Sequence, residues 1–72
     1  MANATSQPWL APGGKPVACV EKIKVLEDNL RELVETAQDA LDDAVLLGVD
    51  PEHARQRMAQ AITALRSDYA TL

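Results

Sequence analysis

CVEKIKVLEDNLRELVETAQDALDDAVLL, residues 19–47, decides the fold of this 72-residue chain. Its apolar residues recur at alternating three- and four-residue spacings, the heptad pattern of a long amphipathic helix. This row comprises Cys19, Ile23, Leu26, Leu30, Leu33, Ala37, Ala40, Ala44 and Leu47. No proline or glycine interrupts the row, so we expect one helix over residues 17–47 with Pro16 in its first turn. Because Lys15 is a poor N-cap, a start at Cys19 or Val20 is the alternative.

Residues 48–52 carry the signals of a helix end followed at once by a helix start. Gly48 suits a left-handed C-terminal cap. Asp50 suits an N-cap, Pro51 suits the first helical position, and Glu52 complements the helix dipole. The sequence therefore predicts a tight turn here.

A second stretch with helical spacing follows this turn, and its apolar residues are Ala54, Met58, Ala61, Ile62, Leu65 and Tyr69. We expect a second helix over residues 51–69. A link of two or three residues forces neighbouring helices to lie antiparallel. The sequence thus predicts an all-α fold, an antiparallel two-helix hairpin over residues 17–72.

Residues 1–16 show neither helical nor strand periodicity, and they contain several prolines and glycines. We expect a flexible tail in this region, disordered or extended. Its one large aromatic residue, Trp9, precedes Leu10 between two prolines. Three roles stay open for Trp9: it folds back over the first helix, it anchors in a pocket of a partner, or it has no role.

The charge balance excludes some classes of partner. The net charge is −4, and the seven basic residues are scattered along the chain. Nucleic acids and anionic membrane surfaces both require clustered basic residues, so neither is expected. No apolar run approaches the ~20 residues that cross a bilayer. One cysteine cannot form a disulfide within the chain, which with the lack of a signal peptide favours the cytoplasm.

The first helix carries more apolar surface than the second can cover. A second apolar row, Val20, Val34 and Leu41, lies beside the first. A chain of this size buries only about 60% of its surface even when compact. Three covers are open: a second copy that completes a four-helix bundle, the Trp9–Leu10 segment, or a larger host protein. The candidate partner-binding residues are therefore Trp9, Leu10, Val20, Ile23, Leu26, Val34 and Leu41.

The sequence contains no catalytic, cofactor-binding or metal-binding motif. Cys19 is either a thiol activated by a helix N-terminus or a small apolar filler. His53 is expected about 40 Å from Cys19 by helix rise and reads as a first-turn residue. An acidic group is either a solvated face or a docking surface for a basic partner, and it comprises Glu35, Asp39, Asp42 and Asp43.

These features predict a small cytoplasmic helical hairpin that binds protein and has no catalytic activity or cofactor. Such a chain acts as an adaptor, a regulator or an accessory subunit, and its partner is another protein, a second copy of itself, or both. The alternative is a thiol- or metal-dependent function of Cys19 at an oligomer interface.

Overall fold

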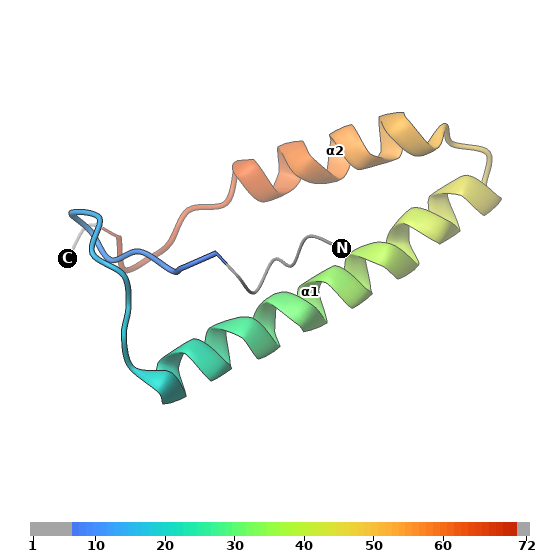
Figure 1. The fold of residues 1–72 in the computed structure, drawn as a ribbon. Coiled ribbons are helices and arrows are strands. Elements are labelled where there is room, and N and C mark those ends of the chain that lie inside the picture. Colours follow the sequence, from blue (N-terminus) through green and yellow to red (C-terminus); the bar gives the residue numbers. More distant parts are fainter. Residues whose placement is uncertain (1–6, 71–72) are drawn as a thin grey trace. The chain divides into compact units, whose positions relative to one another are not determined.

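The computed structural model describes residues 7–70, which contain two α-helices and no named strand (Figure 1). α1 spans Val20–Leu46 and α2 spans Pro51–Thr63. The predicted all-α helical hairpin is confirmed. The chain divides into two compact units, Met1–Val34 and Glu35–Leu72, and α1 contributes one half to each.

In the first unit, residues 9–17 form a closed loop before α1. Its two closing hydrogen bonds run from the Ala11 N–H to the Lys15 carbonyl and from the Val17 N–H to the Trp9 carbonyl, both 2.7 Å. Two glycines at the tip have φ of 93° and 97°, a region that favours residues without a Cβ. No helix forms between residues 7 and 16, as predicted, and residues 1–6 of the predicted tail lie outside the described part.

The expected start of the first helix at Val17 is wrong, and the alternative start at Val20 is confirmed. The Val17 N–H is engaged with the Trp9 carbonyl, so the loop holds Val17 outside the helix. The Cys19 carbonyl accepts from the Ile23 N–H at 3.0 Å, which makes Cys19 the cap of the first turn. At the other end the helix stops one residue before the expected limit.

In the second unit, α1 ends in the predicted glycine cap. Gly48 has φ of 97°, and its N–H donates to the Val45 carbonyl at 3.0 Å. The Val49 N–H donates to the Ala44 carbonyl at 2.9 Å. These two bonds define a Schellman motif, which satisfies carbonyls that the helix end leaves open.

Substitution of Gly48 tests this cap. Nothing lies within 4 Å of a Cβ built at Gly48, so the cost of Gly48→Ala comes from the backbone alone. A left-handed conformation costs an L-residue roughly 1–2 kcal/mol, and we expect a loss of this size in urea unfolding. Gly48→Asn is the control and should lose less, because asparagine tolerates this region. Equal losses in both variants would contradict the account.

α2 begins as predicted. The Asp50 carboxylate accepts from the His53 N–H at 2.9 Å, and Pro51 is the first residue of the helix. Asp50 therefore satisfies one of the amides that a helix N-terminus leaves open. The start of α2 could therefore be predicted from two adjacent residues, Asp50 and Pro51.

The expected end of the second helix at residue 69 is wrong, since α2 stops at Thr63. Leu65 and Tyr69, which supplied the apolar spacing in this stretch, are 70% and 77% exposed. A short helix depends on packing for its stability, and these side chains supply none. The Ser67 hydroxyl instead accepts from the Tyr69 N–H at 3.0 Å, a local bond that competes with helix.

The second unit has a very small core. Ala54 on α2 is 5% exposed, and it is the only buried residue among residues 7–70. Ala44 on α1 and Met58 on α2 are half-buried, and they line the same hollow as Ala54. The small side chain of Ala54 thus lies at the closest packing that the described residues contain.

Candidate protein-interaction surface

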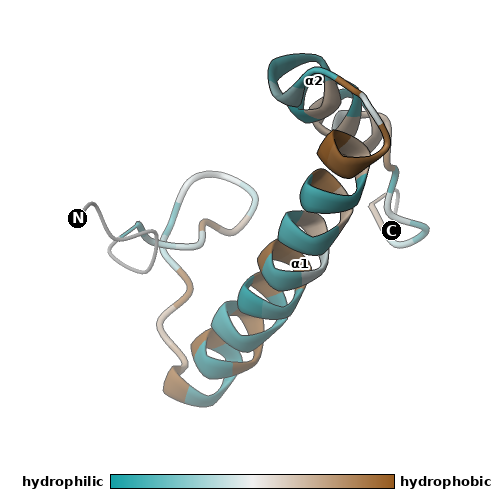
Figure 2. Ribbon diagram, turned by 90° about the vertical axis from the view of Figure 1, so that its right-hand side faces the viewer, coloured by the Kyte–Doolittle hydropathy of each residue, from teal (hydrophilic) through white to brown (hydrophobic). Residues whose placement is uncertain are grey.

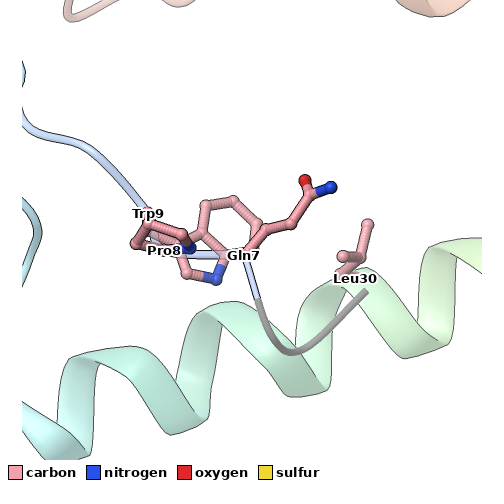
Figure 3. A pocket seen from close by; sticks show the side chains of 4 residues that line it. All are labelled: Gln7, Pro8, Trp9 and Leu30. Atoms are coloured by element: carbon pink, nitrogen blue, oxygen red, sulfur yellow. The ribbon is translucent and has the colours of Figure 1, made fainter. Parts of the chain in front are cut away.

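In the first unit, Trp9 lies against α1. Its indole N–H donates to Glu27 Oε2 at 2.6 Å, and both residues are half-buried. Trp9 also borders a hollow with Gln7, Pro8 and Leu30, and Figure 3 shows its ring beside Pro8 above the helix. Of the three roles left open for Trp9, the structure contains the fold-back.

Glu27 is a site residue that the sequence reasoning missed. It lies seven residues after Val20 and seven before Val34, so it occupies the same helical row as Val20, Val34 and Leu41. A carboxylate in an otherwise apolar row is the signal that singles it out. Here its carboxylate accepts a hydrogen bond from the indole N–H, the one polar group of the Trp9 ring. A partly buried indole requires such an acceptor.

Trp9 fluorescence reports on this contact, because the chain has no other tryptophan. Glu27→Ala removes the acceptor of the indole N–H, so we expect a red-shifted emission and stronger acrylamide quenching. Glu32→Ala is the matched control, since Glu32 is an exposed carboxylate on the same helix. An emission in the unsubstituted protein equal to that of free indole in water would contradict the contact.

The loop covers part of the apolar row in the first half of α1. Ile23, Leu26 and Leu30 are half-buried there. An open hollow remains beside Leu26, bordered by Val17 from the loop and by Val25 and Lys22 from the helix. The loop therefore covers the apolar row in this half of α1 only in part.

The other candidate residues are more open. Leu10, Val20 and Val34 are 60%, 78% and 57% exposed, whereas Leu41 is half-buried.

In the second unit, one side of the contact between α1 and α2 is hollowed. The hollow is lined by Ala40, Ala44, Val49, His53, Ala54, Arg57 and Met58. Five of these seven residues are apolar, and the other two are His53 and Arg57. His53 is exposed, and its backbone N–H is the partner of Asp50.

The opposite side of the same contact carries large apolar residues. Leu41 and Val45 each follow a hollow-lining alanine by one residue, which is about 100° around α1. In antiparallel helices an onward rotation along either sequence turns toward the same side. Ile62 follows the hollow-lining Ala54 by eight residues, about 80° around α2, so it lies on that side too. Val45 and Ile62 are 43% and 49% exposed and Leu41 is half-buried. We call Leu41, Val45 and Ile62 the free face.

Leu46 and Leu47 provide a contrast to the free face. Both are 84% exposed, and apolar residues are visible at this end of α1 in Figure 2. Leu46 lies about 100° beyond Val45 around the helix, so it lies outside the free face. It serves below as a matched control.

Charges differ between the two halves of α1. The second half carries four exposed carboxylates, Glu35, Asp39, Asp42 and Asp43, and no basic residue. Asp42 accepts from the Gln38 amide at 3.2 Å. On α2, Arg55 pairs with Glu52 one turn earlier. Asp42 and Arg55 flank the free face from opposite helices.

In the first half of α1, charges are paired along the helix. Asp28 accepts from Lys24 at 2.9 Å and from Arg31 at 3.0 Å. The hydrogen bond from Lys24, followed by the one from Arg31, lowers the pKa of the Asp28 carboxyl. These pairs are exposed, so they favour the helix only weakly.

Cys19 is exposed at the N-terminus of α1. A hydrogen bond from the backbone N–H of Lys22 lowers the pKa of its thiol, and the Glu21 N–H and the Lys22 charge act in the same direction. Open helix N-termini commonly stabilise a thiolate in this way.

Alkylation with iodoacetamide tests this environment. We expect the rate for Cys19 to reach half its maximum at a lower pH than that of a free cysteine peptide, whose pKa is about 8.5. Lys22→Ala keeps the backbone N–H and removes the charge, so it should leave most of the shift. A midpoint at or above that of the peptide would contradict the account.

Within residues 7–70, no three His, Cys, Asp or Glu side chains converge as metal ligands would. In that same part of the chain, neither helix combines the length and apolar character that crossing a bilayer requires. Comparison with protein-family models, curated proteins and solved structures finds no match to this chain.

Proposed function

We propose that this chain is a protein-interaction module of the cytoplasm, an adaptor, regulator or accessory subunit without catalytic activity of its own, which binds protein through the free face. The observation that carries the proposal is the exposure of this face. Val45 and Ile62 leave 43% and 49% of their surface in water, although they lie beside the contact between the two helices.

The free energy of burying apolar side chains also supports this proposal. Full burial of one aliphatic side chain contributes about 1.5–3 kcal/mol relative to exposure. The second unit realises little of this gain, because only Ala54 is buried among the described residues. Coverage of Leu41, Val45 and Ile62 by another protein supplies what the hairpin lacks.

Photo-crosslinking in cells that make the protein tests the proposal. Benzoylphenylalanine placed at Val45 should form adducts with protein, of whatever mass, after irradiation. The same residue placed at Leu46 is the control, because Leu46 is more exposed but lies outside the free face. No adduct at Val45, or equal adducts at both positions, would overturn the proposal.

The lowered thiol pKa of Cys19 favours a second candidate, a thiol-dependent function at an oligomer interface. The alkylation profile described above tests its premise. Cys19→Ser should then abolish the thiol-dependent function, whereas crosslinking at Val45 should remain unchanged.

A further inference from the structure

We propose that the free face binds a second copy of this chain, with α1 of each copy beside α2 of the other and both turns at one end. The result is a four-helix bundle with twofold symmetry. This inference rests on the proposed function and names its partner.

Exposure of the free face within the second unit favours a second copy. Val45 and Ile62 leave 43% and 49% of their surface in water, and Leu41 is half-buried. A twofold contact places the same apolar residues of both copies against one another, so one interface covers both free faces.

Charge complementarity between α1 and α2 also favours this pairing. Asp42 lies six residues before Gly48, and Arg55 lies six residues after Val49, so the two are level in an antiparallel hairpin. If α1 of one copy lies beside α2 of the other with the turns together, Asp42 faces Arg55 of the second copy. Twofold symmetry repeats the contact, so each dimer gains two attractive pairs.

Charge also selects against the other pairing. If α1 lay beside α1 of the second copy with both turns at one end, the acidic halves would face one another with no basic residue between them. Like charges across an interface disfavour that partner arrangement. Pairing of α1 with α2 avoids this repulsion.

Sedimentation equilibrium of the full chain at micromolar concentration and low ionic strength is the primary test. We expect twice the monomer mass. Val45→Lys should weaken the dimer by at least about tenfold, since it places a charge in the apolar interface. Leu47→Lys should leave the dimer unchanged, because Leu47 is 84% exposed and lies about 200° from Val45 around the helix. Circular dichroism verifies that each variant stays helical. A monomer in the unsubstituted protein, or equal weakening by both variants, would overturn the inference.

Exchange of the charges at Asp42 and Arg55 tests whether α1 pairs with α2 of the other copy. These substitutions leave the apolar residues of the free face unchanged. Asp42→Arg and Arg55→Asp should each weaken self-association by about fivefold, because each creates two like-charge contacts. A mixture of the two variants should associate as tightly as the unsubstituted chain, since both contacts become attractive again. Asp39→Arg and Arg57→Asp carry the same charge changes away from the free face, and they should have little effect.

The outcomes separate this inference from the proposed function. A monomer that forms adducts of other masses through Val45 would overturn the second copy as partner and leave the interaction module standing. A monomer that forms no adduct would overturn both. Failure of the mixed variants to recover affinity would overturn the pairing of α1 with α2.

Discussion

Leu33→Pro should destroy most of the helical signal of α1. Position 33 lies in the interior of Val20–Leu46, where proline removes a backbone hydrogen bond and clashes with the preceding turn. The cost is about 3 kcal/mol or more, against a total of roughly 4–11 kcal/mol for a chain of this length. We expect a large loss of far-UV circular dichroism and a much lower melting temperature.

Leu33→Ala separates the backbone effect from the side-chain effect. Leu33 is 46% exposed and alanine is the best helix former, so this variant should lose little helicity. Full helicity in Leu33→Pro would show that α1 is not continuous through this position.

Ala54→Leu should destabilise the hairpin, although leucine is a good helix former. Ala54 is 5% exposed, so a leucine side chain at this position has little access to water unless its neighbours shift. Overpacking of this kind typically costs about 1–3 kcal/mol. Urea unfolding of the variant should show a lower midpoint.

Ala59→Leu is the matched control for this substitution. Ala59 is exposed on the same helix, so the larger side chain reaches water and stability should change little. If Ala54→Leu were as stable as Ala59→Leu, Ala54 would not lie at the closest packing of the second unit.

The turn between the helices could be predicted because its signals are local. Gly48 supplies the positive φ, Asp50 supplies the cap and Pro51 fixes the first helical position, each within a few residues of sequence. The start of α1 and the end of α2 could not be predicted in this way. Val17 is drawn into a loop by a bond to Trp9, and Leu65 has helical spacing but no surface to pack against.

The candidate site was predictable in part. The spacing of Val20, Val34 and Leu41 in multiples of seven residues indicated a second apolar row, and the fold-back of Trp9 was one of three open alternatives. The pairing of Trp9 with Glu27 required the loop geometry, which periodicity does not contain. Val45 and Ile62 were missed as site residues. The side of the helix contact on which they lie depends on how α2 packs against the second half of α1, and the sequence pattern does not contain this packing.

Contact between two copies across the free face is the central claim, and an isotope-filtered NOE experiment tests it most directly. Equal amounts of carbon-13-labelled and unlabelled chain are unfolded together, refolded and examined at micromolar to millimolar concentration. Contact across the free face predicts NOEs between Leu41 methyl groups of one copy and Ile62 methyl groups of the other. NOEs confined to one copy, with the methyl groups of Val45 and Ile62 open to a soluble paramagnetic probe, would contradict it.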